Sequence, residues 1–166
     1  MSLTAFENSE SIFQTVSPAE SRMHLEARLQ QHSGGTAEGA SAAQTCLLPL
    51  LEALDWDGME RHLFEALPHL EGILGIFDLR AVLTRLNFRV TPTRRSPRQL
   101  TAEQLPCLVK LGDDVLVGLG RSGDGRFRAF SGDARRTVAI DFSKLKNAEV
   151  FLIERRDEDA RSAYRH

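Results

Sequence analysis

One stretch of the chain, residues 105–120, restricts the possible folds more than any other. It contains two short, almost wholly apolar runs, Cys107–Leu111 and Val115–Leu119. Between these runs, Gly112-Asp113-Asp114 has the composition of a tight turn. Two nearly all-apolar strands joined by a tight turn are typical of the central hairpin of a sheet that is covered on both faces. The sequence therefore predicts that this hairpin lies at the centre of a sheet between two layers of other residues.

The length and composition indicate one domain with a real core. The chain has 166 residues, of which 42% are hydrophobic, and a domain of this size buries most of its apolar surface. No apolar run approaches the roughly 20 residues of a membrane helix, so we expect no direct membrane insertion by this segment. The first residues lack a basic patch followed by an apolar core, so we expect no signal peptide. The net charge of −2 gives no indication of a nucleic-acid partner.

The two cysteines, Cys46 and Cys107, both lie inside apolar runs. This position favours buried, reduced thiols in a cytosolic protein over a disulfide framework. The chain has no C-x-x-C pair, and its five histidines lack the spacing of metal ligands. We therefore expect no metal and no cofactor in this domain.

Helix signals come before the hairpin. Ser17-Pro18 predicts the start of a short helix that ends near Gln31, and residues 32–41 have the composition of a flexible linker. We interpret residues 1–40 as a weakly ordered lead. The main domain is predicted to begin at residue 41 with a buried helix, CLLPLLEAL, that is capped by Ser41 or Thr45. Pro49 fits inside it only if the helix begins at Thr45, and otherwise kinks it.

Two more helices are predicted before the strands. One begins at Asp57 with a capping-box pattern that ends at Glu60, and it stops at Pro68. The other follows Gly75 and has the clearest amphipathic spacing in the chain, with Asn87 suited to the left-handed position at its end. The apolar residues of this last helix are Leu79, Val82, Leu83 and Leu86.

Strand signals begin after residue 87. Phe88–Val90 alternates as a short edge strand that ends at Pro92, and a basic loop, Thr93–Arg98, follows it. Further strands are predicted at 126–129, 137–140 and 150–153, the last of which closes the sheet, and residues 157–166 are a charged tail expected to fray. Three helices followed by five or six antiparallel strands make an α+β fold. We expect one core that contains Cys46, Leu50, Leu54, Leu79, Leu83, Leu86, Val109, Val115, Val117, Phe151 and Ile153.

The order of these elements resembles a known family. The buried helix CLLPLLEAL, two amphipathic helices, the strand LNFRV, a basic loop and the hairpin LPCLVKL–DVLVGLG are similar to the amino-terminal peptidase domain of ABC transporters that export bacteriocins. Those domains belong to family 39 of the cysteine peptidases. The sequence resembles more closely the degenerate version on type I secretion transporters for large repeat-rich proteins, through Gly72-Ile73-Leu74, Leu105-Pro106 and Phe151–Arg155. The resemblance covers about residues 41–156. It implies a papain-like fold, with N-terminal helices packed on a C-terminal antiparallel β-sheet.

The resemblance also locates the positions of the catalytic groups. If Cys46 is the small residue that follows the nucleophile by four positions, the nucleophile position falls on Ala42. The position of the catalytic histidine falls on Asp114-Val115, and that of the third member falls near Asp133. No histidine occurs in residues 70–165, so the strands cannot supply a base. Because thiolate chemistry needs a cysteine with a base within hydrogen-bond reach, we expect no catalytic residues.

The resemblance thus implies a non-catalytic, substrate-binding or docking domain of a bacterial type I secretion ABC transporter that exports a toxin or an adhesin. Such a domain lies on the cytoplasmic side of the inner membrane, and its partners are an unfolded secreted protein and the remainder of the transporter. ATP is expected only in a nucleotide-binding domain that would follow His166. Trp56 and the Thr93–Arg98 loop are candidate flanks of the binding site. The site itself is predicted at the remnant of the catalytic cleft: Ala42, Ala43, Gln44, Thr45, Asp113, Asp114 and Val115.

Two alternatives of different classes remain open. One is an active cysteine peptidase that uses Cys46 to process leader peptides. The other is a stand-alone α+β protein-interaction domain that is unrelated to transporters.

Overall fold

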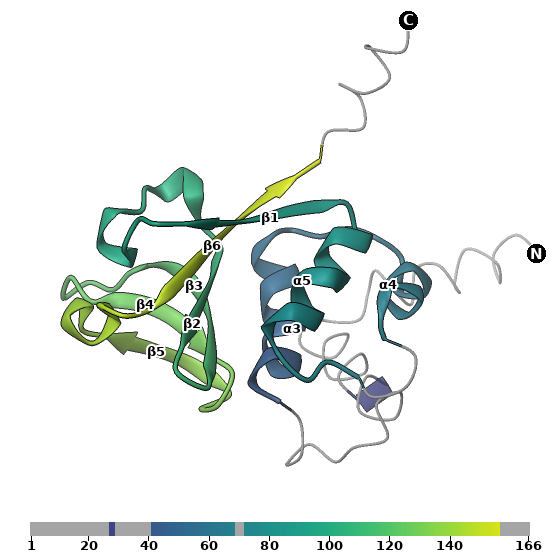
Figure 1. Ribbon diagram of the computed structural model, residues 1–166, viewed down its shortest axis with the longest axis horizontal. Coiled ribbons are helices and arrows are strands. Elements are labelled where there is room, and N and C mark those ends of the chain that lie inside the picture. Colours follow the sequence, from purple (N-terminus) through teal and green to yellow (C-terminus); the bar gives the residue numbers. More distant parts are fainter. Residues whose placement is uncertain (1–26, 29–40, 69–71, 157–166) are drawn as a thin grey trace, which may run out of the picture.

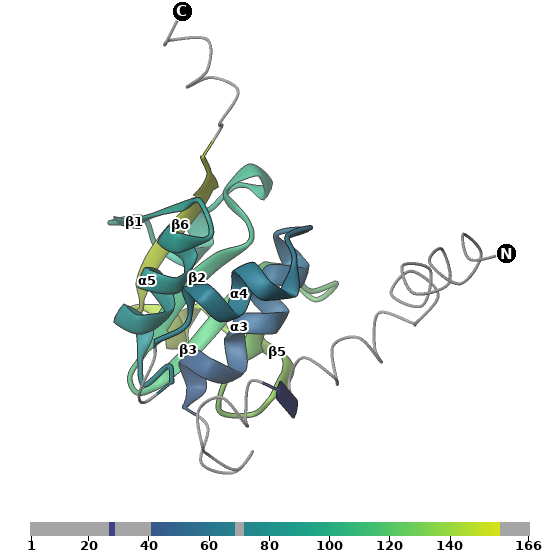
Figure 2. The same cartoon turned by 90° about the vertical axis from the view of Figure 1, so that its right-hand side faces the viewer.

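The structure, a computed structural model, describes residues 27–28, 41–68 and 72–156, and within these ranges it has a layer of helices against a single sheet (Figure 1). The helices are α3 (Ala42–Ala53), α4 (Glu60–Ala66) and α5 (Ile76–Arg85). Short 3₁₀ turns are η2 (Pro97–Gln99), η3 (Ala102–Gln104) and η4 (Phe142–Leu145). The strands are β1 (Phe88–Thr93), β2 (Cys107–Leu111), β3 (Asp114–Arg121), β4 (Phe127–Ser131), β5 (Arg136–Ile140) and β6 (Glu149–Arg155). Seen from the side, the helices lie over one face of the sheet (Figure 2).

Most of the predicted lead lies outside the described residues. The helix predicted from Ser17 to about Gln31 is described only at Ala27 and Arg28, which are helical. The Arg28 guanidinium lies 4.7 Å from the centroid of the Phe64 ring and forms an ion pair with Glu60, so this part of the lead contacts α4. The predicted linker and the predicted charged tail, residues 157–166, also lie outside the described ranges. None of the helices in those ranges is long and apolar enough to cross a membrane.

Helix α3 begins at Ala42 because Ser41 caps it. The Ser41 Oγ accepts a hydrogen bond of 3.1 Å from the Gln44 N–H, which satisfies a backbone donor of the first turn. Thr45 already belongs to that turn, and its Oγ donates to the Ser41 carbonyl at 3.0 Å. The cap predicted at Ser41 is therefore confirmed, and the alternative start at Thr45 is wrong. Pro49 lies inside the helix and is buried.

The other two helices differ in how well the sequence predicts them. The start of α4 at Glu60 has no side-chain cap, so the capping box predicted from Asp57 is wrong. The indole of Trp56 packs on Gly58 so closely that an added Cβ would lie 2.2 Å from the ring, and residues 56–59 stay outside the helix. Helix α5 matches its prediction, because Leu79, Val82 and Leu83, at positions i, i+3 and i+4 of the predicted apolar face, are fully buried. Asn87 follows it with φ 70°, the expected left-handed residue.

The sheet is antiparallel, and its strand order is β1-β6-β2-β3-β4-β5. The predicted hairpin, β2–β3, occupies the centre of this order, as expected. The last strand, β6, pairs with both β1 and β2, so it closes the sheet from an interior position.

Strand β1 is the predicted edge strand, but it continues through Pro92 to Thr93. The Asn87 carbonyl accepts a hydrogen bond of 2.8 Å from the Arg156 N–H, and Phe88 lies opposite Arg155. Because hydrogen-bonded pairs alternate in an antiparallel ladder, Pro92 then falls at a position whose N–H would face the free edge. A proline is tolerated at such a position. The prediction that this strand ends at Pro92 is therefore wrong by one residue.

Two apolar clusters cover the two faces of the sheet. The first lies between the sheet and the helices, where α3 packs on β3 and β4 and α5 packs on β1. The second lies on the opposite face, under η4 and the segment before β2. Since side chains alternate along a strand, Leu108 belongs to the first cluster and Val109 to the second. Val109 was therefore wrongly assigned to the single predicted core. The other predicted core residues lie in the first cluster or pack against it.

Candidate functional site

The three positions at which the family resemblance places catalytic groups lie close together where α3 begins. Gly132, in the turn after β4, lies against the first residue of α3, and an added Cβ at Gly132 would be 2.2 Å from the Ala42 carbonyl oxygen. The Gly132 N–H donates to the Val115 carbonyl at 2.9 Å. The nucleophile position and the base position are thus joined through Gly132. We call this site the remnant cleft. It consists of Ala42, Val115 and Gly132 and the neighbouring residues Asp113, Asp114 and Asp133.

Asp114 is fixed by its neighbours in the remnant cleft. Its Oδ1 accepts hydrogen bonds from the Val115 N–H at 2.8 Å and from the Asp133 N–H at 3.0 Å. Its Oδ2 accepts a bond of 2.7 Å from the hydroxyl of Ser131, a buried polar residue. A carboxylate in this position organises the turn after β4 by accepting bonds. It occupies the position where the family resemblance places a histidine.

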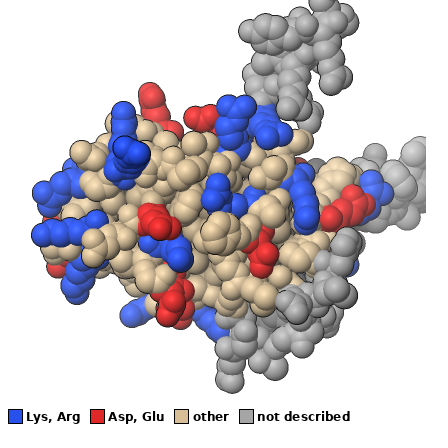
Figure 3. Space-filling view, viewed as in Figure 1, with Lys and Arg blue, Asp and Glu red and all other residues tan. Residues whose placement is uncertain are grey.

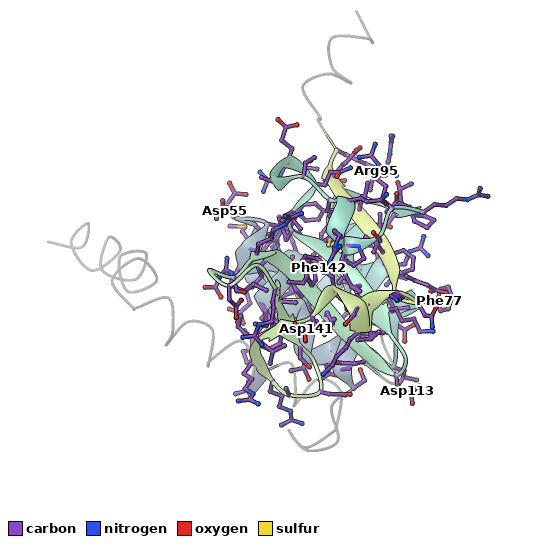
Figure 4. All side chains as sticks on the ribbon, turned by 90° about the vertical axis from the view of Figure 1, so that its left-hand side faces the viewer. Asp55, Phe77, Arg95, Asp113, Asp141 and Phe142 are labelled. Carbon is purple, nitrogen blue, oxygen red and sulfur yellow. The ribbon has the colours of Figure 1, made fainter. Side chains whose placement is uncertain are left out.

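Carboxylates give the edge of the remnant cleft a negative charge. Asp113 and Asp133 are exposed, and Asp114 is half-buried. The pKa of Asp133 is raised by partial loss of solvent and by the charges of Asp114 and Asp113. Figure 4 shows Asp113 at the periphery of the molecule.

Cys46 lies behind the remnant cleft and has no access to solvent. Its Sγ donates a hydrogen bond of 3.1 Å to the Val115 carbonyl. Burial raises the pKa of the thiol far above its usual range, and the charges of Asp114 and Asp133 raise it further, against a smaller lowering by a backbone hydrogen bond from Gly132. Cys107, buried in β2, has its pKa raised to about 12 by burial. Both cysteines are free and buried, as predicted.

The remaining predicted site residues lie on the first turn of α3. Ala43 is buried, while Gln44 and Thr45 are half-buried. They follow Ala42 directly in the chain, and Asp113 directly precedes Asp114. The structure brings Ala42 close to Val115 through Gly132, and Ser131 donates to Asp114; Gly132 and Ser131 were not among the predicted site residues. Ser131-Gly132-Asp133 reads as an ordinary turn, and nothing in such a sequence indicates that its glycine lies against the backbone of a distant residue.

The two candidate flanks lie apart from the remnant cleft. Trp56 follows the opposite end of α3, where it lines a surface pocket of about 900 Å³ with Arg85 and Arg155, so it does not flank the cleft as expected. The start of the Thr93–Arg98 loop lines a second pocket, of about 560 Å³. Among the described residues, no group of three or more His, Cys, Asp and Glu side chains is arranged to hold a metal ion.

Comparison with solved structures finds a likeness that bears on the fold. No protein-family model and no curated protein matches the chain. The structure is similar to the crystal structure of the N-terminal peptidase C39-like domain of the toxin secretion ATP-binding protein from Vibrio parahaemolyticus, with a TM-score of 0.52 and 18% sequence identity. The match covers 70% of this chain and 98% of that one. The predicted α+β, papain-like fold is confirmed: the chain has the fold of a peptidase C39-like domain.

Proposed function

We propose that the chain is a non-catalytic docking domain of a bacterial type I secretion ABC transporter, and that it binds an unfolded segment of the secreted protein at the remnant cleft. The observation that carries this proposal is the set of residues at the former catalytic positions. Ala42 presents a methyl group where a thiol is needed, and the Asp114 carboxylate, held by three hydrogen bonds, stands where an imidazole is needed. In this assignment the domain acts on the cytoplasmic side of the inner membrane, and ATP binds elsewhere in the transporter.

The environment of Cys46 argues against the alternative of an active peptidase. A nucleophilic cysteine requires a lowered pKa and a base within reach. Cys46 has a raised pKa, no solvent access and a carbonyl oxygen as its hydrogen-bond partner. His62, the one imidazole among the described residues, is exposed on α4 and lines the pocket beside Trp56.

The likeness to a transporter domain favours this proposal over a stand-alone interaction domain. The Vibrio protein is described as a toxin secretion ATP-binding protein, and its N-terminal domain is matched along 98% of its length. A domain of this fold without catalytic groups is useful through its surface. An unfolded segment with exposed backbone is a suitable partner for such a surface, since it binds weakly and can be released.

The geometry of the remnant cleft restricts how such a segment binds. Gly132 lies directly on the Ala42 backbone, which leaves no slot between them. In this proposal the segment therefore contacts the border of the remnant cleft, which consists of Gln44, Thr45 and Asp113. Because Asp113 and Asp133 are exposed carboxylates, this border favours segments with neutral or basic side chains over acidic ones.

The test is a titration of the isotope-labelled chain with a permanently unfolded basic protein, reduced and carboxamidomethylated ribonuclease A, and with the same protein in its folded state. Amide shifts at residues 42–45 and 113–115, seen only with the unfolded form, are the expected result. Asp113→Lys should weaken this binding several-fold. Glu103→Lys, an identical charge change at an exposed residue of η3, is the matched control and should leave the binding unchanged.

Two outcomes would refute the proposal. The first is a preference for the folded form, or shifts confined to the face of the sheet that lies under η4. The second is stoichiometric labelling of native Cys46 by a thiol-directed peptidase probe near neutral pH, lost in Cys46→Ser, which would restore the peptidase alternative.

A further inference from the structure

A second surface feature lies between the start of α5, the end of β1 and the start of β6. It is a pocket of about 560 Å³ that shares no residue with the remnant cleft. We call it the basic pocket. Its lining includes the cations Arg80, Arg94, Arg95, Lys110 and Lys146 and the aromatic residue Phe77.

The charge of this lining contrasts with that of the whole chain. The chain has a net charge of −2, yet the pocket is lined by five cationic side chains and one carboxylate. Four of these cations come from loops or strand ends, and Arg94, Arg95 and Lys146 are exposed. Figure 3 shows Lys and Arg side chains at the left of this face and also along its top and towards its right, with Asp and Glu side chains between them.

Little within the described part of the chain neutralises these cations. None of Arg94, Arg95 and Lys146 forms an ion pair with another described residue. Glu149 lies directly opposite Lys110 in the pairing of β6 with β2, so it offsets one charge of the set. The pocket therefore keeps an excess of positive charge available to an anionic partner.

The basic pocket also offers apolar surface. Phe77 is 77% exposed, although its neighbour Ile76 is buried in the first core cluster. Arg80 lies over the Phe151 ring, 4.9 Å from its centroid, and so covers a second aromatic ring in the wall of the pocket. In Figure 4, Arg95 lies near the top of the molecule and Phe77 lies at its right-hand edge. Exposed aromatic rings beside unpaired cations are common in peptide-binding surfaces.

We propose that the basic pocket binds an acidic, extended segment of a partner protein, with carboxylates at Arg94, Arg95 and Lys146 and one aliphatic side chain on Phe77. Charge complementarity identifies the acidic character of the partner. The exposed ring favours a peptide over a small anion, because an inorganic anion gains nothing from an apolar contact. The remnant cleft, with its exposed aspartates, repels the same segment, so the two sites accept different parts of a chain and the second does not depend on the first.

The experiment measures binding of a fluorescein-labelled peptide of alternating Asp and Ser with a central Leu to the full 166-residue chain. A peptide with Asn in place of Asp is the neutral control. The acidic peptide should bind more tightly than the neutral one, and added salt should reduce the difference. The double variant Arg94→Glu/Arg95→Glu should weaken binding of the acidic peptide by roughly tenfold or more, since each exposed ion pair is exchanged for a repulsion.

Matched variants separate this site from bulk charge. Arg89→Glu/Arg136→Glu changes the net charge by the same amount at exposed residues outside the pocket, and binding should stay within about twofold of the wild type. Phe77→Ala should weaken binding of the Leu-containing peptide and leave a peptide with Ser in place of Leu unaffected. All these side chains are exposed, so the variants are expected to fold, which circular dichroism would verify.

Three results would overturn the proposal. One is equal weakening by the two double variants, which indicates a bulk electrostatic effect. Another is displacement of the acidic peptide by millimolar inorganic phosphate, which indicates a simple anion site. The third is capture of the chain by vesicles of phosphatidylcholine and phosphatidylglycerol, lost in the pocket variant, without binding of the peptide.

Discussion

Replacing Gly132 with alanine tests the contact that joins the helices to the sheet at the remnant cleft. The added Cβ would lie 2.2 Å from the Ala42 carbonyl oxygen and 2.7 Å from the Ala42 Cα, whereas ordinary contacts begin at 3.4 Å. The φ angle of Gly132 is not in the left-handed range, so alanine adds no backbone strain of its own. The two backbones must separate by about 1 Å, and overpacking of this kind costs about 1–3 kcal/mol of unfolding free energy.

Urea unfolding followed by circular dichroism would measure this change. Gly123→Ala is the matched control, because Gly123 is exposed in the turn before β4 and nothing lies within 4 Å of an added Cβ. That variant should be neutral or more stable by up to about 1 kcal/mol, since alanine reduces the entropy of the unfolded chain. If Gly132→Ala were as stable as the control, α3 would not rest on the turn after β4, and the description of the remnant cleft would be wrong.

Three further predictions concern single side chains. Cys46 should react with a thiol reagent only when the chain unfolds, because the buried thiol stays protonated at neutral pH, and labelling in native buffer would contradict this. Leu83→Ala should lower the unfolding free energy by about 2–5 kcal/mol because Leu83 is fully buried, and a loss below about 0.5 kcal/mol would show that α5 is not packed on the sheet. Asp133→Asn should be as stable as the wild type or more so at pH 7. Because the folded-state pKa of Asp133 is raised, the wild type loses the stability linked to this proton as the pH rises through that pKa. Any gain in unfolding free energy of the variant over the wild type should therefore vanish at low pH, where the wild-type carboxyl is protonated.

Much of the fold could be predicted from the sequence because the relevant signals are local. The spacing of Leu79, Val82 and Leu83 reports one helix face, and the apolar runs on either side of Gly112 report a hairpin, whatever the rest of the chain does. The start at Ser41 likewise depends on a hydrogen bond between residues three apart. The predicted capping box at Asp57 failed because a local preference lost to the packing of an aromatic ring on Gly58.

The candidate site was less accessible to sequence reasoning. The family resemblance predicted a site at Ala42 and Asp114, but it gave no sign that Asp114, in β3, accepts hydrogen bonds from Ser131 at the end of β4 and from Asp133 in the turn after it. Such contacts depend on which strands become neighbours, and no short pattern encodes that. The same is true of the basic pocket, because Arg94, Lys110 and Lys146 are separated in the chain and meet only when β6 lies beside β1 and β2.

The position of β6 has a consequence for the order in which the chain folds. Strands β2 to β5 form a succession of hairpins, each pairing with the strand next in sequence, so they can assemble as they leave the ribosome. Within the described part of the chain, strand β1 pairs with β6 alone, and β6 is the last of the described strands in sequence. Until β6 arrives, the apolar edge of β2 is unpaired, and β1 and the helix that precedes it have no strand to join them to the hairpins. Completing the sheet requires β1 to pair with β6 across the intervening strands β2 to β5, a non-local closure that is slow on entropic grounds. The nascent chain thus carries an unpaired strand edge from the emergence of β2 until that of β6, and this interval is when aggregation or capture by a chaperone is most favoured.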